Sequence, residues 1–312
     1  MRLDPEFEPL HGFPDPDLTK LPDIRAFMTA MQNAMPRRQM RSGAFEDRSI
    51  PGDENQIPIR IYAPSSGTPR GALLYLHGGA FVLGNLDSEH EICVDYAEGA
   101  GCVVVSVDYR LAPEHPFPAA HEDAWTALRW LFDHADELGV DPACIGVGGG
   151  SAGAALAAGL AVRARDEGFP ALRFALLVQP VIDHLSGSAS ARTFNHTPFL
   201  KADHLQLAWR AYLGPTPPSG RELAYAAPFA ATDLAGFPDT CVIIGNVDPS
   251  RDEALAFGLR LVEAGVETEL HLMPGIPHGF DLVGDAPVTR RLLEVRIAAL
   301  SRALSKPAQG QV

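Results

Sequence analysis

The chain has few cysteines, and their spacing excludes a disulfide-rich secreted domain and a cysteine-based zinc site. Four cysteines occur among 312 residues, and none forms a C-x-x-C pair. A disulfide-stapled secreted scaffold or a zinc knuckle would need more cysteines at closer spacing. We therefore expect Cys93, Cys102, Cys144 and Cys241 to be buried free thiols in a cytoplasmic protein.

Cationic residues are also scarce. Lysine and arginine number 25 against 39 acidic residues, which gives a net charge of −14. A polyanion would be repelled by this surface, so nucleic acid and anionic membranes are excluded as partners. The one short basic run, at 36–38, is too small to reverse that conclusion.

No apolar run approaches the roughly 18 residues that a membrane helix requires. The first ten residues, "MRLDPEFEPL", have no apolar centre and do not resemble a signal peptide. We therefore expect no membrane anchor. A P-loop pattern and an H-E-x-x-H pattern are both missing, and the histidines show no ligand spacing. The sequence thus predicts no phosphate-binding loop, metal or cofactor.

What the chain does contain is an alternation of strand-like and helix-like segments from about residue 44 onward. Residues 57–64 alternate as a half-exposed strand, whereas 71–77 and 102–109 are continuous apolar runs, typical of strands buried on both faces. This alternation predicts an α/β fold with a mostly parallel central sheet flanked by helices on both faces. Further strands are predicted at 144–149, 173–180, 240–246 and 267–273, and helices at 117–139, 251–265 and 289–304.

Two segments interrupt this alternation of strands and helices, and we expect them to form a helical cap. Residues 1–43 and 190–228 have helical character without strands, so the α/β core would comprise 44–189 and 229–312. The alternative is that they merely elaborate the packing. Several apolar side chains could line a substrate pocket, or they could only pack the cap onto the core. They are Phe27, Met28, Met31, Met35, Phe81, Phe199, Leu205 and Trp209.

The stretch "GVGGGSAGAALAAG" at 146–159 resembles a flexible linker, but its flanks predict a strand before it and a helix after it. Within it, Gly149, Ser151 and Gly153 form a G-x-S-x-G pattern. A serine on so sharp a strand-to-helix turn needs very small residues two places to either side. This context favours a nucleophilic serine over a structural glycine turn.

A second small-residue motif, "HGGAF" at 77–81, ends the predicted strand at 71–77. Its backbone N–H groups, with that of Ala152, are suited to binding an oxyanion. We expect His77 to hold this loop rather than to take part in chemistry.

A serine nucleophile needs a base and an orienting acid, which follow it in the order acid then histidine in this kind of architecture. His278 and Asp248 each follow a predicted strand, at the sheet edge where ligands of open α/β sheets gather. The rival acid, Asp252, lies at the start of a helix where N-capping suffices to explain it. The rival base, His271, lies within a strand.

With these residues in hand, the sequence resembles the hormone-sensitive-lipase-like family of α/β-hydrolases. The matching motifs are "HGGAF", "DYRLAPEHPFPAA" at 108–120, "GGSAG" and "DPSRDE" followed by "HGF". The resemblance implies a carboxylesterase for short to medium acyl chains, with an N-terminal and an inserted cap segment, and is compatible with a homodimer. It also implies a nucleophile, base and acid at Ser151, His278 and Asp248, and oxyanion donors at Gly78, Gly79 and Ala152.

The chain departs from the family pattern beside the nucleophile. Gly150 stands where Asp or Thr is usual, Ala154-Ala155 where Gly-Asn is common, and Ala80 where glycine is common. Ala80 still has a backbone N–H group, so the oxyanion site is retained. Gly150 bears on the placement of Ser151 and on substrate preference.

These observations predict a serine carboxylesterase acting on a small-molecule ester through an acyl-enzyme. A hydrolase of the same fold that cleaves lactones or amides is the first alternative, because it would share the triad. A non-catalytic receptor and an interaction scaffold are further alternatives, and the intact triad disfavours the receptor.

Overall fold

The computed structural model describes residues 2–12, 20–34, 45–53 and 55–305, with the side chains of 31–34 left aside. Eight strands form one sheet in the order β1-β2-β4-β3-β5-β6-β7-β8. The first two pairings, β1 with β2 and β2 with β4, are antiparallel, and all others are parallel. The strands are β1 (Glu46–Pro51), β2 (Gln56–Tyr62), β3 (Ala72–Leu76), β4 (Val103–Val107), β5 (Ile145–Gly150), β6 (Phe174–Val178), β7 (Asp239–Gly245) and β8 (Thr268–Met273).

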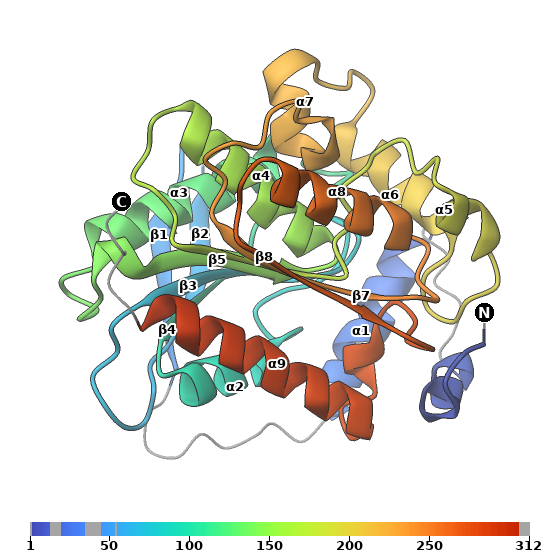
Figure 1. The fold of residues 1–312 in the computed structure, drawn as a ribbon, viewed down its shortest axis with the longest axis horizontal. Helices are drawn as coiled ribbons and strands as arrows, with labels where there is room; N and C mark the ends of the chain where they lie inside the picture. The colour runs from blue at the N-terminus through green and yellow to red at the C-terminus, as the bar shows by residue number, and fades with distance from the viewer. Residues whose placement is uncertain (1, 13–19, 35–44, 54, 306–312) are drawn as a thin grey trace.

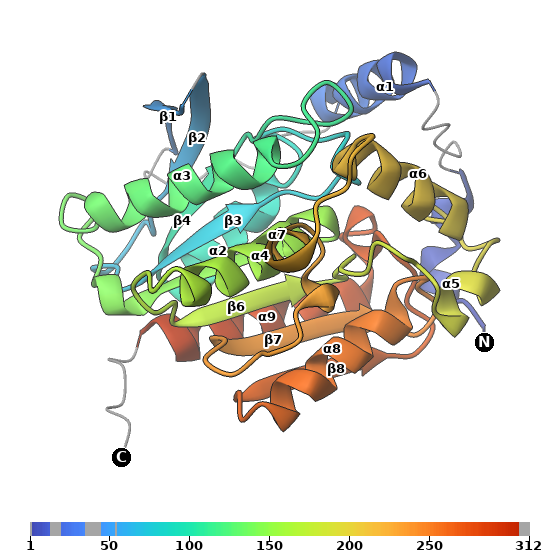
Figure 2. The same cartoon turned by 90° about the horizontal axis from the view of Figure 1, so that it is seen from above.

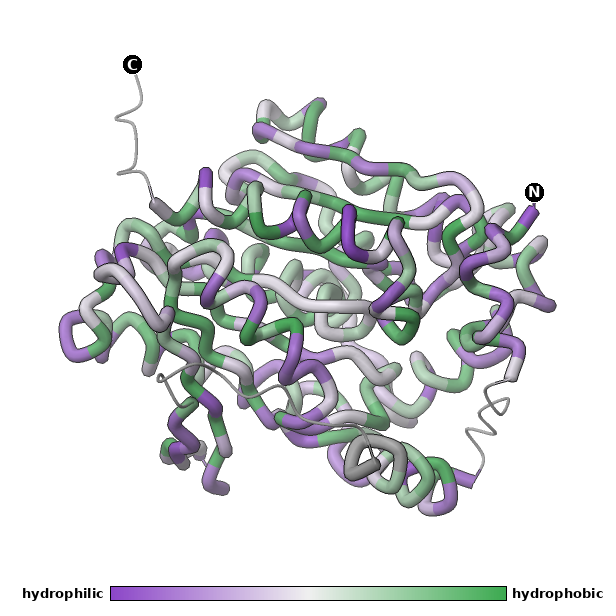
Figure 3. Tube along the Cα trace, turned by 90° about the horizontal axis from the view of Figure 1, so that it is seen from below, coloured by the Kyte–Doolittle hydropathy of each residue, from purple (hydrophilic) through white to green (hydrophobic). Residues whose placement is uncertain are grey.

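Helices cover both faces of this sheet (Figure 1). On one face lie α3 (Ala119–Asp133), α4 (Ala152–Asp166) and α8 (Arg251–Glu263), and on the other lie α2 (His90–Ala100) and α9 (Pro287–Leu304). Each layer buries its apolar side chains in its own cluster against the sheet. Figure 3 shows hydrophobic residues along the central strands and hydrophilic residues at many of the outer turns. The predicted α/β-hydrolase architecture, with its mostly parallel sheet, is confirmed.

Three further helices lie beyond the carboxyl ends of the parallel strands. Figure 2 shows α1 (Leu21–Ala34), α5 (Ala189–Thr193) and α6 (Ala202–Leu213) at that end of the molecule. Because ligands bind at this edge of α/β sheets, these three helices lie where contact with a substrate is expected. The next helix, α7 (Gly220–Ala226), packs instead on α4. Short 3₁₀ segments occur at Pro5–Gly12, Pro142–Cys144, Pro228–Ala230 and Phe280–Leu282.

The structure differs from the sequence-based expectation at three elements. Strand β1 and helix α2 had no predicted counterpart. The helix expected over 117–139 ends at Asp133, because His134 leaves the helical backbone angles and the Ala135 N–H group donates to the Phe132 carbonyl, three residues back instead of four. The chain turns on to Gly139, whose φ is 68°, and Val140 N–H donates to the Ala135 carbonyl. This bond across five residues is a normal way to end a helical segment.

The four cysteines are buried and free, as expected. Among the helices that the structure describes, none is long and apolar enough to cross a membrane.

Candidate active site

Ser151 lies at the corner between β5 and α4, with φ 55° and ψ −116°. Such angles are strained for a residue with a side chain and persist only when the surroundings impose them. Gly149 and Gly153 make the corner possible. A Cβ atom on Gly153 would lie 1.9 Å from the Leu76 carbonyl oxygen, and one on Gly149 would lie 2.4 Å from that same oxygen. Only glycine therefore lets the corner pack against the end of β3.

The corner brings Ser151 to a histidine and a carboxylate from two distant loops. His278, which follows β8, has Nε2 2.8 Å from Ser151 Oγ. Its Nδ1 lies 2.7 Å from Oδ2 of Asp248, which follows β7. The side chains of His278 and Asp248 are 3% and 0% exposed, so bulk water does not compete for their hydrogen bond. Because a carboxylate cannot donate, Nδ1 carries the proton and Nε2 is left to accept from the serine hydroxyl.

Asp248 is held in place by its second oxygen. Its Oδ1 accepts from the backbone N–H of Ser250 at 2.8 Å and from the Ser250 hydroxyl at 2.7 Å. Both carboxylate oxygens are thus engaged, which orients the acid toward His278. The rival acid, Asp252, instead accepts from the Ser190 N–H group and pairs with Arg251. The rival base, His271, lies in β8 beside Glu269, away from this chain of hydrogen bonds.

The loop that carries His278 is fixed from two sides. Gly279 N–H donates to Gln179 Oε1 at 2.5 Å, which ties the loop to the end of β6. Two residues further along the chain, the Asp281 carboxylate accepts hydrogen bonds from both terminal nitrogens of Arg296, at 3.0 and 2.7 Å. Arg296 is 1% exposed, so this paired contact joins α9 firmly to the loop. The sequence analysis did not identify Gln179 or Arg296, because only the folded chain brings them to the loop.

His77 acts as a structural part of the neighbouring loop. Its ring is stacked on Tyr109, with centroids 4.2 Å apart, and the Tyr109 hydroxyl donates to the His77 carbonyl at 2.6 Å. Burial lowers the pKa of His77 to about 4, so the imidazole is neutral near neutral pH. These contacts agree with the expectation that His77 holds the loop.

The N–H group of Gly78 is already occupied. It donates to Glu89 Oε1 over 2.7 Å, which differs from the expectation that it faces an oxyanion. Among the described residues, the N–H groups of Gly79 and Ala80 have no acceptor. The N–H group of Ala152 is at the first position of α4, where backbone N–H groups lack intrahelical partners. Glu89 was not singled out in the sequence, since nothing local links it to a loop eleven residues earlier.

The apolar candidates for substrate contact divide by location. Phe81, Leu205 and Trp209 are at most 2% exposed. Phe81 stacks on Tyr212 of α6 and contacts Trp209, so these aromatics pack α6 onto the loop. Such burial favours a packing role for all three.

Phe199 lies beside the catalytic histidine candidate. A Cβ atom on Gly279 would come within 2.6 Å of the Phe199 ring, so the ring rests directly on the residue after His278. Phe27 is 40% exposed on α1. Met28 is half-buried on the same helix, while the Met31 side chain and Met35 lie outside the described part of the chain.

A surface hollow of about 280 Å³ beside α6 is separate from this site. It is lined by residues of and near α6, Trp209 among them, and not by Ser151 or His278.

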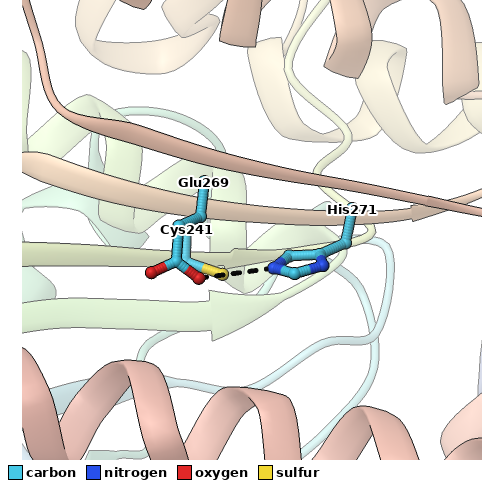
Figure 4. Close-up of side chains that lie close together, drawn as sticks. All are labelled: Cys241, Glu269 and His271. Atoms are coloured by element: carbon cyan, nitrogen blue, oxygen red, sulfur yellow. Dashed lines mark hydrogen bonds and ion pairs between the residues drawn. The ribbon is translucent and has the colours of Figure 1, made fainter.

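One group of side chains in the described residues has the donor types of a metal site. Cys241, Glu269 and His271 lie on the neighbouring strands β7 and β8, with ligand atoms within 4.8 Å of one another (Figure 4). Burial raises the pKa of the Cys241 thiol to about 12, and Arg302 forms an ion pair with Glu269. These residues lie within β7 and β8, before the loops that carry Asp248 and His278, so we assign this group no part in the chemistry at Ser151.

Known proteins are similar to this chain over most of its length. A family model described as the alpha/beta hydrolase fold matches residues 73–282. Esterase LipI from Mycobacterium tuberculosis is 39% identical over 241 residues, covering 75% of this chain and 74% of that protein. Carboxylesterase NlhH from the same species is 38% identical over 271 residues, covering 83% of each. The solved structure of a bacterial heroin esterase matches with a TM-score of 0.91 and 40% identity, over 97% of this chain and 98% of that one.

Identity of this extent across most of the chain is accompanied by the same fold and by a serine, histidine and aspartate in hydrogen-bond contact. The chain therefore belongs to the hormone-sensitive-lipase-like family of carboxylic ester hydrolases with the α/β-hydrolase fold.

Proposed function

We propose that the protein is a serine carboxylesterase that hydrolyses short- to medium-chain acyl esters through an acyl-enzyme. In this proposal Ser151 is the nucleophile, His278 the general base and Asp248 the orienting acid. The observation that carries it is the continuous path from Asp248 Oδ2 to His278 Nδ1, at 2.7 Å, and from Nε2 to Ser151 Oγ, at 2.8 Å.

In the first half of the reaction, Ser151 Oγ attacks the ester carbonyl while its proton passes to His278 Nε2. Asp248 stabilises the imidazolium that forms. His278 then gives the proton to the departing alkoxide, and the alcohol leaves an acyl group on Ser151.

The second half repeats these steps with water. His278 takes a proton from a water molecule that attacks the acyl carbonyl, and the acid product leaves when the proton returns to Ser151. Because the serine lies at the amino end of α4, the helix dipole also favours the negative charge that develops beside it.

For the oxyanion we propose the N–H groups of Gly79, Ala80 and Ala152. The lack of an acceptor for the Gly79 and Ala80 N–H groups within the described structure supports this choice. The donors expected from the sequence were Gly78, Gly79 and Ala152. Ala80 takes the place of Gly78, because the Gly78 N–H group donates to Glu89.

We further propose that residues 1–43 and 190–228 form a cap over this site and select the substrate. Arg25 of α1 supports this, because it donates to the carbonyls of Val82, at 2.9 Å, and Ala112, at 3.0 Å. Phe199, resting on Gly279, is our candidate for direct contact with the substrate. The many apolar residues in these segments favour a neutral ester.

Hydrolysis of p-nitrophenyl esters from acetate to palmitate tests the proposal, with the wild type compared with Ser151→Ala. We expect activity that is highest for short to medium chains and that is lost in the variant. Activity that persists in a folded Ser151→Ala protein would exclude Ser151 as the nucleophile. If the folded wild type cleaves a lactone or an amide but none of the esters, the same triad would act on that bond instead.

A further inference from the structure

The carboxylate of Glu89 lies between the serine corner and the HGGAF loop, and it joins them to β3. Its Oε1 accepts from the Gly78 N–H group at 2.7 Å, and its Oε2 accepts from the hydroxyl of Tyr75 in β3. A Cβ atom on Gly150 would lie 3.4 and 3.5 Å from the two carboxylate oxygens. The acid is therefore next to the residue that precedes the serine.

We propose that Glu89 is a positioning residue for ester hydrolysis, which anchors the Gly78 N–H group so that the following N–H groups are aimed at the oxyanion. This inference rests on the proposed function of the site. Glu89 does not touch the reacting atoms in this proposal and acts through the loop.

The backbone of the loop shows why an anchor is needed. Gly79, Ala80 and Phe81 have φ values of 126°, 54° and 63° in succession. Two of these residues carry side chains, so the conformation is strained and persists only under outside restraint. Stacking of Phe81 on Tyr212 restrains the far end of the loop. The bond from Gly78 to Glu89 restrains the near end, directly before the proposed donors.

Gly150 provides the room that this arrangement needs. With no side chain at 150, the carboxylate of Glu89 fits against the backbone beside Ser151. A longer side chain at that position would compete for the same space. The arrangement thus gives a physical reason for glycine at the place where the sequence departs from its family pattern.

Glu89 is free for this role because it does not cap the helix that follows it. It occupies the N-cap position of α2, yet its side chain makes no capping hydrogen bond there. Its substitution should therefore change the loop more than the helix. Burial raises the pKa of Glu89, while the Tyr75 and Gly78 hydrogen bonds act in the opposite direction.

The test compares Glu89→Gln, which keeps a carbonyl acceptor for Gly78, with Glu89→Met, which has similar length and no acceptor. We expect Glu89→Met to lower kcat for a p-nitrophenyl ester about 10²-fold with KM nearly unchanged, since losing one aligned oxyanion donor costs about that much. Glu89→Gln should stay within about fivefold of the wild type. The affinity for an alkyl trifluoromethyl ketone, which forms an oxyanion on the serine, should fall in parallel with kcat.

Tyr96→Phe is the matched control, because Tyr96 contacts the ring of Tyr75 but its hydroxyl has no hydrogen-bond partner among the described residues. We expect it to leave kcat unchanged. If Glu89→Met does not fold, Tyr75→Phe provides the test, and it should lower kcat severalfold while the protein remains folded.

Two outcomes would overturn the inference. One is a folded Glu89→Met protein that keeps the wild-type kcat and ketone affinity. If Glu89→Met does not fold, the same result for Tyr75→Phe counts instead. The other is an equal loss in Glu89→Gln and Glu89→Met, which would show that the hydrogen-bond acceptor is not what matters. Loss of activity in Ser151→Ala, measured alongside, keeps a failure of this inference distinct from a failure of the proposed function.

Discussion

Two aspartates four residues apart, Asp248 and Asp252, have different partners in the structure. Asp248 is fully buried against His278 and Ser250, whereas Asp252 faces Ser190 and Arg251 at the start of α8. The amide of Asp248→Asn would leave His278 without its negative partner and in the wrong tautomer. We expect kcat to fall by about 10³–10⁴ with little change in KM.

Asp252→Asn is the control for that prediction, measured by the same steady-state kinetics on one p-nitrophenyl ester. It should reduce kcat by less than about threefold, because the hydrogen-bonded path to Ser151 does not include it. If Asp252→Asn lowered kcat more than Asp248→Asn does, Asp252 would be the orienting acid.

At the scale of elements, the strand–corner–helix unit of β5 and α4 depends on a close approach to β3. A Cβ atom on Gly153 would lie 1.9 Å from the Leu76 carbonyl oxygen. We therefore expect Gly153→Ala to lower the free energy of unfolding by roughly 3 kcal/mol or more, since the clash is with backbone and cannot be relieved by a side-chain rotation.

Urea denaturation followed by circular dichroism measures this change. Gly150→Ala is the matched control in the same corner, because its Cβ atom would have no contact closer than 3.4 Å. Equal stability of the two variants would mean that the corner can move away from β3.

Arg25 joins helix α1 to the body of the molecule. Arg25 donates to two backbone carbonyls and pairs with Glu114 through two hydrogen bonds, at 2.8 and 2.9 Å. If α1 belongs to the cap, Arg25→Met should raise KM for medium-chain esters about fivefold, equivalent to ~1 kcal/mol of binding. The kcat for the acetate ester should stay unchanged.

Michaelis–Menten kinetics across the ester series tests that prediction. Glu114→Gln serves as its control, because Arg25 would keep both carbonyl contacts, and an exposed ion pair contributes little. A KM increase that is the same for every chain length would instead indicate a general loss of structure.

At the scale of the whole molecule, buried acids determine how stability varies with pH. Burial, together with the nearby charges of Asp183 and Asp248, raises the pKa of Glu253 from 4.5 to about 8. Between these two pH values the folded protein binds more protons than the unfolded chain, so this group makes stability fall as pH rises from about 4.5 to about 8. Glu253→Gln removes that dependence.

The melting temperature of Glu253→Gln, relative to the wild type, should therefore increase from pH 5 to pH 8.5. Glu263→Gln, at an exposed position of the same helix, should show no such trend. A difference between Glu253→Gln and the wild type that stays constant with pH would contradict the prediction.

Much of the architecture follows from local patterns in the sequence. Continuous apolar runs identify β3 and β4 as buried parallel strands, and the small residues around Ser151 require a sharp corner. Parallel strands end at one edge of the sheet, so residues that directly follow strands, such as Asp248 and His278, are brought near that corner. The proposed triad was therefore predictable, because short-range periodicity encodes where each strand lies and where it ends.

Contacts between side chains from separate elements were decided only by the tertiary structure. The sequence does not reveal that Glu89 occupies the Gly78 N–H group, that Gln179 holds Gly279, or that Arg25 reaches Val82. Each of these contacts depends on the angle and distance at which two elements pack, to within about one ångström. Hydrophobic periodicity specifies which face of an element is buried, whereas the packing of all elements together decides which polar group on one meets which on another.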